Sequence, residues 1–309
     1  MFPAIKPAPA DAAPVNDGND EDNLDNLETT KFQYHYHFYP AYAAFDDKGN
    51  LVVSDFGSDC IKVLRYGDML HKRTIGLVGG GEHRSQFKFP QGIAFDRYGH
   101  LVVADYDNHR VQVLRYSDGA HVLTIGSMGS GAGQLKRPTG VAVDPEGNIV
   151  VHDGSDNGRV QVFRLSDGAH IRSMCSKGSD NGQLRGGGDV AFDDQGNLVV
   201  SDGGNHRIQV LRYSDGLHVR TIGSRGASVG QFCHPRGIAF VRHLGHLVVA
   251  DYGNHRVQVL MYSDGSHVRT IGSEGSGAGQ LKHPEGVAVD GNGCIVVCDT
   301  GNRRLQVLT

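Results

Sequence analysis

The sequence predicts an all-β protein built from six copies of one four-stranded unit. A Val/Ile/Leu run that ends in an aspartate recurs along the 309 residues at intervals of 48 to 50 positions. These aspartates are Asp55, Asp105, Asp153, Asp202, Asp251 and Asp299. The 44 glycines, the short apolar runs and the absence of tryptophan favour many short strands joined by tight turns. One such copy cannot bury its apolar face alone, so the copies are expected to pack on one another.

The third copy shows the four strands of the unit. Strand segments are expected at 139–144, 149–153, 159–165 and 170–174, separated by the turn PEGN, a loop and the turn SDG. Gly, Asn and Asp-Gly supply the backbone conformations that tight hairpins need. Six antiparallel meanders arranged in a ring make a six-bladed β-propeller. We expect its blades at approximately 41–89, 90–137, 138–186, 187–234, 235–283 and 284–309.

The sixth copy ends after three strands, at RLQVLT. The segment 29–40 is the candidate for its missing outer strand. The chain must then cross from the outer to the inner edge of the ring, which takes at least about five extended residues. We therefore expect the strand at 29–34 and the crossing at 35–40. A closed sixth blade predicts a monomer, whereas an open one would expose an edge and favour association.

The first residues differ from the rest. Positions 1–28 hold seven acidic residues, one lysine and few large apolar side chains, so they are expected to form a disordered acidic leader. No basic and apolar start typical of a secretion signal is present, and no apolar run is long enough to span a membrane. These features predict a cytoplasmic protein. The five cysteines show no CxxC spacing, which argues against a zinc finger or a disulfide framework.

The repeated phrases resemble a known family. DYGNHRVQVL at 251–260 and QLKHPEGVAVD at 280–290 are similar to the NHL repeat, and the resemblance extends over all six copies. It implies a six-bladed propeller that acts as a non-catalytic binding scaffold. In the related tripartite-motif ubiquitin ligases, such propellers select protein or RNA targets. This chain shows no RING, B-box or coiled-coil pattern, so a ligase role would depend on a partner that supplies those parts. The missing tryptophan and the long period argue against WD40 repeats.

An acid and a base recur at the two ends of one hairpin loop. The pairs are Asp105 with Arg110, Asp153 with Arg159, Asp202 with Arg207, Asp251 with Arg256, and Asp299 with Arg304. Five equivalent sites around a ring are better suited to structural braces than to catalysis, and bidentate pairing within each loop is expected. Cys60 takes the arginine position in the first copy, so that blade is expected to be the loosest.

Histidine is frequent but dispersed. His109, His206 and His255 fall one per blade, and the positions expected at the mouth of the channel are Gln91, Thr139, Gly187, Arg236 and Glu285. The peptide-amidating lyases, which are similar in architecture, place a metal on central histidines. No equivalent set of three histidines is seen here, so we expect no metal, no cofactor and no catalysis. The alternative is a metal-dependent lyase or lactonase with a site in the channel.

The long connections between blades and the loops between second and third strands should lie on one face, here called the loop-rich face. It is expected to carry basic residues, namely Lys88, Lys136, Arg137, Arg185, His234, Arg236, Lys282 and His283. Aromatic residues follow the strand aspartate at Phe56, Tyr106 and Tyr252, but glycines take this position at 154 and 203. The prediction is a protein partner, or single-stranded RNA, with aromatic contacts over blades five, six, one and two. A solvated rim without a ligand and an extracellular-matrix role stay open as alternatives.

Overall fold

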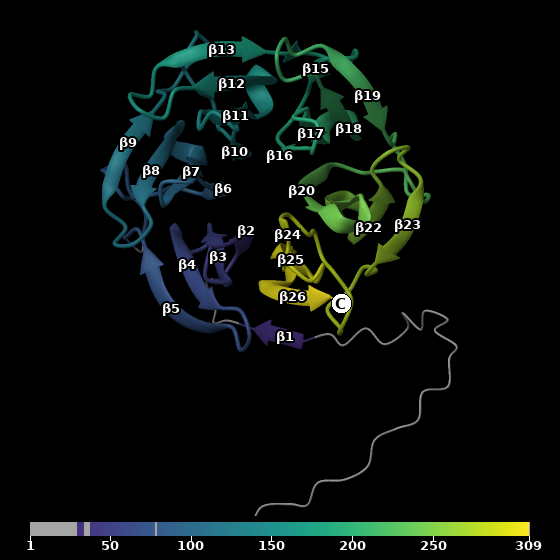
Figure 1. Cartoon of the computed structure of the whole chain (residues 1–309). Helices are drawn as coiled ribbons and strands as arrows, with labels where there is room; N and C mark the ends of the chain where they lie inside the picture. The colour runs from purple at the N-terminus through teal and green to yellow at the C-terminus, as the bar shows by residue number, and fades with distance from the viewer. Residues whose placement is uncertain (1–29, 34–37, 78, 309) are drawn as a thin grey trace, which may run out of the picture.

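The structure, a computed structural model, describes residues 30–33, 38–77 and 79–308. Six four-stranded antiparallel sheets stand around a ring, with the inner strand of each sheet toward the centre (Figure 1). The predicted fold class is therefore correct. The acidic leader expected at 1–28 and residues 35–37 of the expected crossing lie outside the described residues.

Five of the six sheets are simple meanders whose strands follow chain order. Blade one holds β2 (Pro40–Phe45), β3 (Asn50–Asp55), β4 (Cys60–Arg65) and β5 (Leu70–Ile75). Blade two holds β6 (Pro90–Phe95), β7 (His100–Asp105), β8 (Arg110–Arg115) and β9 (His121–Ile125). Blade three holds β10 (Val141–Val143), β11 (Ile149–Asp153), β12 (Arg159–Phe163) and β13 (His170–Met174), which match the four expected segments apart from shorter ends on the first and third.

The second half of the ring repeats this order. Blade four holds β16 (Val190–Phe192), β17 (Leu198–Asp202), β18 (Arg207–Leu211) and β19 (His218–Ile222). Blade five holds β20 (Pro235–Val241), β21 (His246–Asp251), β22 (Arg256–Met261) and β23 (His267–Ile271). Blade six holds β24 (Val287–Val289), β25 (Ile295–Asp299) and β26 (Arg304–Leu308).

The first described strand completes the last blade. β1 (Thr30–Gln33) lies within the segment 29–34 and pairs antiparallel with β26, in a register that runs from Thr30↔Val307 to Gln33↔Arg304. The sixth sheet therefore has the order β24-β25-β26-β1, with strands from both ends of the chain (Figure 1). Main-chain hydrogen bonds between the two ends close the ring, and β26 is not left as an edge.

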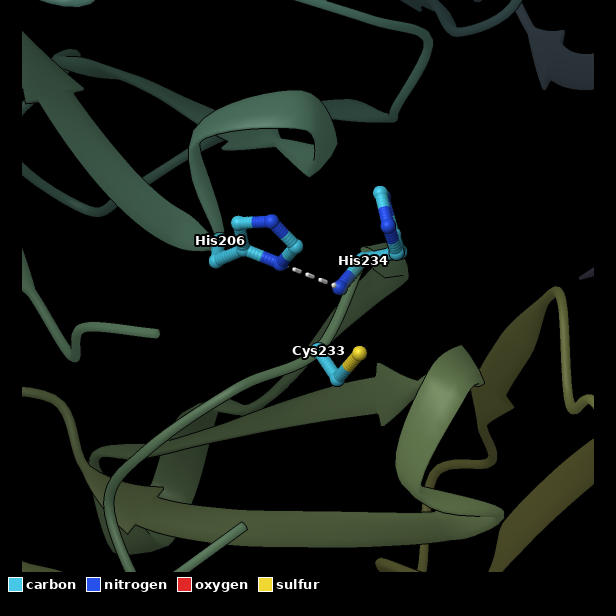
Figure 2. A group of neighbouring side chains, drawn as sticks. All are labelled: His206, Cys233 and His234. Carbon is cyan, nitrogen blue, oxygen red and sulfur yellow. Dashed lines mark hydrogen bonds between the residues drawn. The ribbon is translucent and has the colours of Figure 1, made fainter. Parts of the chain in front are cut away.

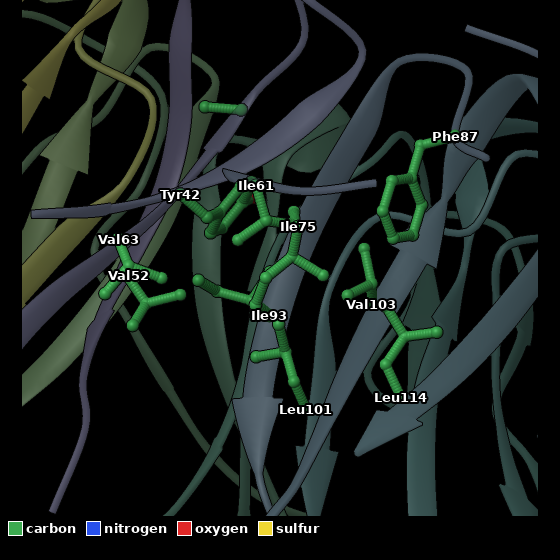
Figure 3. Packing of buried hydrophobic residues seen from close by; sticks show 11 residues of the cluster. Tyr42, Val52, Ile61, Val63, Ile75, Phe87, Ile93, Leu101, Val103 and Leu114 are labelled. Carbon is green, nitrogen blue, oxygen red and sulfur yellow. The ribbon is translucent and has the colours of Figure 1, made fainter. Parts of the chain in front are cut away.

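The core lies between blades rather than inside them. Every residue of β3 is buried, and successive side chains point to opposite faces of the sheet. Val52 packs with Ile93 and Leu101 of blade two (Figure 3), whereas Leu51 and Val53 belong to the cluster shared with blade six. Six such clusters surround the ring, each built by two neighbouring blades. Loss of one blade would expose two of these clusters, so the ring is expected to unfold cooperatively.

The connections between blades are pinned by one buried side chain each. These side chains are Phe87, Leu135, Leu184, Phe232 and Leu281, and all are fully buried. Backbone packing around them is tight: at Gly223, whose φ is +77°, a Cβ atom would lie 2.3 Å from the Phe232 ring. Only glycine combines that conformation with that close approach. The connections therefore have defined shapes, and they position the loop-rich face.

Candidate binding face

The recurring acid and base form ion pairs in five blades. Arginine Nε lies 2.6 to 2.9 Å from the Oδ2 atom of its aspartate, whose side chain is fully buried. The expectation of bidentate pairing within one loop was wrong. The remaining guanidinium nitrogens donate to carbonyl oxygens of the connection that precedes the blade; those of Arg159, for example, bond Ser130 and Gly131 at 2.7 and 2.8 Å. Each arginine therefore ties its hairpin loop to that connection.

The aspartate is the centre of this arrangement, as blade three shows. The Asp153 carboxylate accepts hydrogen bonds from the Lys136 backbone N–H at 2.7 Å, from Arg159 at 2.7 Å, and from Asn157 and Gln161 at 3.0 and 3.1 Å. A buried carboxylate with four donors is satisfied as an anion and has no lone pair directed at solvent. This geometry is that of a structural brace rather than of a catalytic acid.

In blade one, different residues pair with the buried aspartate. Cys60 holds the arginine position and is buried, which raises the pKa of its thiol to about 12. Lys62 pairs with Val53 in the register position where Gln112 pairs with Val103 in blade two. Its Nζ atom lies 2.6 Å from Asp55 Oδ2, so a lysine replaces the arginine and glutamine together.

The histidine of the Asn-His-Arg phrase links neighbouring blades. His109, His206 and His255 end a short 3-10 turn with φ between 54° and 59°. Each Nδ1 atom accepts a hydrogen bond of 3.1 Å from a backbone N–H at the entrance of the next blade, donated by Arg137, His234 and His283 respectively. These histidines are spread around the ring as expected. Each one has a defined structural role.

One group in the described part of the chain brings three metal-ligating side chains together. The ligand atoms of His206, Cys233 and His234 lie within 4.8 Å of one another (Figure 2). Two features oppose a cation here. Nδ1 of His206 already accepts the His234 N–H, which leaves the ring proton on Nε2. In addition, burial lowers the pKa of His206, and His234 and Arg225 lower it further. The Arg225 charge would also repel a cation at this site.

The channel wall holds a second polar group that sequence reasoning missed in part. Tyr42 and Asp189 occupy positions where the other inner strands carry Gly92, Gly140, Gly237 and Gly286. At Gly92 a Cβ atom would lie 2.5 Å from the Thr139 carbonyl oxygen, so these glycines permit close contact between inner strands. The two exceptions to the repeated glycine were the available signal. Burial raises the pKa of Asp189 to about 7 and also raises that of Glu285, whose carboxylate lies 3.8 Å from Arg236.

The positions expected at the channel mouth are less accessible than anticipated. Gln91, Thr139 and Glu285 are all less than a tenth exposed, because the inner strands pack side by side. Thr139 Oγ1 lies 2.8 Å from Nδ1 of His152, a fully buried histidine in the same wall. These residues belong to the wall between blades and do not form an open set of ligands.

The predicted cations do lie among the loops, but several have acidic partners. Lys136 Nζ is 3.3 Å from Asp156, and Arg137 Nε is 3.6 Å from Asp107 while its guanidinium lies over the Tyr106 ring. Lys88, Arg185, His234 and Lys282 are exposed, whereas Arg236 and His283 are half-buried. The rim therefore mixes both signs of charge at blades two and three.

The predicted aromatic residues are built into stacks. Phe56 stacks on Phe89 at 5.2 Å between ring centroids and contacts Tyr39 at 5.3 Å, with Arg303 over the Tyr39 ring. Tyr252 contacts His283 at 4.7 Å and lies under Arg236. Phe89, the most exposed member at 43%, was missed by sequence reasoning; its place directly before the loop proline was the signal.

Where blade four carries Gly203 in place of these rings, the face is hollowed. A cavity of about 650 Å³ lies between blades four and five, beside Gly203 and Gly204. Arg185, Arg225, Arg236, His206 and His234 line it. The cavity is called the Arg/His pocket below.

A comparison with family models matches the NHL repeat at residues 87–114, 135–163, 188–211, 232–260 and 281–308. The chain is an NHL-repeat protein. The NHL model does not match the first blade, which differs from the other five at Asp59, Cys60 and Lys62, where they carry the His or its equivalent, the Arg and the Gln. The resemblance read from the sequence extended to all six copies, whereas the family match extends to five. No curated protein sequence is similar enough to count as a match.

Solved structures share the NHL-repeat propeller's fold. An auxiliary nutrient binding protein from Bacteroides ovatus matches with a TM-score of 0.66 at 15% identity, covering 94% of this chain and 75% of that one. A chain of a nidogen/laminin complex matches at 0.61 and 18% identity, covering 82% and 85%. A catalytically inactive virginiamycin B lyase from Staphylococcus aureus matches at 0.62 and 13% identity, covering 92% and 86%. Identities this low establish the fold alone.

The described residues include no helix that is both long and apolar enough to cross a membrane.

Proposed function

We propose that this NHL-repeat propeller is a non-catalytic scaffold that binds a protein partner on its loop-rich face. The observation that carries the proposal is that repeated and variable polar residues have different roles. Those that recur in every copy are engaged in hydrogen bonds within and between blades, as the four donors around Asp153 show. Those that vary from blade to blade, such as Arg137 and His234 at the position that Phe89 holds before β6, lie on the loop-rich face, where binding loops of propellers gather.

The charge pattern favours protein over single-stranded RNA. A nucleic acid strand following the ring would pass Asp107, Asp156 and Glu274 as well as the cations. Mixed charges and stacked rings such as Phe56 with Phe89 suit a folded or extended protein segment, which carries both signs and apolar groups. By its resemblance to the propellers of tripartite-motif ligases, we further propose that the partner is a substrate presented to a ubiquitin ligase assembled in trans.

The test compares two triple variants with equal charge change. Lys136→Glu, Arg185→Glu and Lys282→Glu alter the loop-rich face, whereas Arg115→Glu, Arg164→Glu and Arg212→Glu alter exposed turns between third and fourth strands. Affinity capture with quantitative mass spectrometry, with and without ribonuclease, would compare both with the wild type. Partners lost only from the first variant, and retained after ribonuclease, support the proposal. Equal capture by both variants would overturn it, and loss on ribonuclease treatment would point to RNA.

The non-catalytic part of the proposal has its own test. The alternative, a metal-dependent lyase or lactonase, needs a bound metal at the channel or at His206, Cys233 and His234. Elemental analysis of protein purified without chelators or a histidine tag should find less than about a tenth of an equivalent of zinc or calcium. A stoichiometric metal that is lost in Cys233→Ser would contradict this part of the proposal.

A further inference from the structure

The Arg/His pocket is lined by cations from separate elements. Arg185 and Arg225 come from the connections before and after blade four, Arg236 comes from β20, and the rings of His206 and His234 lie 4.3 Å apart. In the described part of the chain, the Arg185 and Arg225 side chains have no ion-pair or hydrogen-bond partner, and Arg236 lies 3.8 Å from Glu285. Unpaired guanidinium groups that share one hollow provide a strong field for an anion.

No carboxylate competes inside the pocket. The lining includes no aspartate or glutamate. Behind it, Asp202 and Asp251 are each bound by an arginine Nε, at 2.9 and 2.8 Å, and by asparagine and glutamine side chains. The carboxylates of Asp202 and Asp251 are therefore already paired within the braces of blades four and five. Glu285, which lies outside the lining, faces Arg236 at 3.8 Å. An incoming anion would meet Arg185 and Arg225, whose guanidinium groups have no acceptor among the described residues.

Glycines make the space. Gly186, Gly187, Gly203 and Gly204 form part of the wall. Gly203 stands where blades two and five carry Tyr106 and Tyr252, and Gly187 stands where most blades carry proline. Because these residues lack side chains, a ligand could approach the main chain closely. A volume of about 650 Å³ is more than an inorganic ion needs and lies within the range of small-molecule sites.

The neighbouring position between blades five and six provides a natural comparison. His255 and His283 are stacked there at the same 4.3 Å, and the same Nδ1 to N–H hydrogen bond joins them. However, Glu274 occupies the register position of Arg225, and its carboxylate lies 3.9 Å from His255. Tyr252 packs against His283 where Gly203 leaves space. The two sites thus share one backbone plan but differ in charge and in one ring: Glu274 replaces Arg225, Glu285 replaces Arg236, Cys233 replaces Arg185 and Tyr252 replaces Gly203.

We propose that the Arg/His pocket binds a phosphate monoester, with the phosphate held by Arg185, Arg225 and the two imidazoles and the organic part in the remaining space. Three terminal phosphate oxygens match several converging donors better than the two oxygens of a carboxylate do, and arginine forks suit them geometrically. Arg225 also decides against a divalent metal on His206, Cys233 and His234. The inference rests on the proposed function only in so far as the phosphate belongs to a partner of the loop-rich face.

The first experiment is calorimetric titration of the full chain with inorganic phosphate, with a phosphoserine peptide and with the same peptide unphosphorylated. We expect phosphate and the phosphopeptide to bind, and the unphosphorylated peptide not to. Arg225→Glu should weaken binding at least tenfold. Lys177→Glu, at the equivalent position one connection earlier, should change it less than twofold. Arg225→Glu recreates the His255 and Glu274 pair, so it is expected to fold, and Arg185→Gln provides a second variant.

Each outcome decides the matter. Equal affinity in wild type and Arg225→Glu, or no binding of either phosphate probe, would overturn the pocket proposal, as would stoichiometric Zn²⁺ binding abolished by Cys233→Ser. Tight inorganic phosphate with no gain for the peptide would identify a small phosphorylated molecule as the source; a gain for the peptide would identify a phosphorylated side chain. If the titration overturns the pocket proposal, partner capture by Arg225→Glu at the wild-type level would still leave the scaffold proposal standing.

Discussion

The backbone N–H of His234 donates a hydrogen bond to Nδ1 of His206, 3.1 Å away, and so joins blade five to blade four (Figure 2). Arg137 and His283 donate the same bond to His109 and His255. An Nδ1 atom that accepts requires the ring proton on Nε2, so each imidazole is neutral when it makes this contact. The histidine of the repeat is therefore a connector between blades, distinct from the arginine that follows it.

Replacing one connector should loosen one junction. His109→Ala leaves the Arg137 N–H without its acceptor, and we expect the free energy of unfolding to fall by about 1 kcal/mol. Urea unfolding followed by circular dichroism would measure it. His121→Ala is the matched control, since that exposed ring contacts Thr124 within its own strand. Equal losses in the two variants would mean that the link between blades contributes nothing specific.

Removing the charge of one brace aspartate should lower the free energy of unfolding more than His109→Ala does. In Asp153→Asn an amide N–H₂ would face donors from Arg159, Asn157 and Gln161, and the arginine would lose its counter-ion. We expect a loss of about 3 kcal/mol or more in the free energy of unfolding. Asp167→Asn, in an exposed turn of the same blade, should leave the urea midpoint almost unchanged. A brace variant as stable as this control would refute the structural role of the pair.

Blade one should exchange its amide hydrogens fastest among the blades. Lys62 holds Asp55 with one ammonium group, whereas arginine elsewhere also bonds the preceding connection. Native-state hydrogen exchange should therefore show less protection in β4 and β5 than in β22 and β23. The double variant Cys60→Arg with Lys62→Gln should narrow the difference. Equal protection in the unmodified protein would show that the lysine pairing is an adequate replacement.

The Asp189 carboxyl should make stability depend on pH. Burial raises its folded-state pKa to about 7, against about 3.9 in the unfolded chain, so the folded state binds this proton more tightly. The contribution of the protonated carboxyl to the free energy of unfolding is complete below pH about 4 and is lost as the pH rises to about 7. The stability of Asp189→Asn relative to wild type should therefore increase over this interval. Glu285, Arg236 and Tyr42 share the channel wall and are unchanged in the comparison.

Asp194→Asn, an exposed carboxyl in the same blade, is the control for this pH series. Its difference from wild type should show no comparable trend between pH 4 and 7. If the Asp189→Asn difference were also flat, the carboxyl would have to ionise normally in the folded protein, and its burial in the wall would be without electrostatic consequence.

Sequence reasoning reached the strands because their signals are local. The turn PEGN and the aspartate at position 153 locate β11 to the residue, and the short final copy pointed to a closing strand in 29–34, where β1 lies. The ion pairs were also foreseen, since Asp153 and Arg159 stand at opposite ends of one loop. The hydrogen bonds from each arginine to the preceding connection were not foreseen, because acceptors such as Ser130 and Gly131 lie more than 25 residues away in the chain.

The binding surface was harder to place, because a list of cations contains no information about their partners. Lys136 and Arg137 appeared as free positive charges, yet each faces an aspartate across the rim. Aromatic contacts were expected on blades five, six, one and two, and Tyr252 and Phe56 do lie there, within stacks. The largest difference between the predicted binding surface and the structure comes from glycines. Gly203 was noted as a missing ring, but only packing shows that its absence leaves a pocket between blades.

The order of the strands, the number of blades and the braces were determined by the sequence itself, because repetition and turn chemistry act over a few residues and each copy restates them. The Arg/His pocket was decided by tertiary structure alone. Arg185, Arg225 and Arg236 meet because neighbouring blades are rotated about a common axis, which brings together residues that stand up to about 50 positions apart. An electrostatic field depends on distances in space, and these distances exist only once the ring has closed.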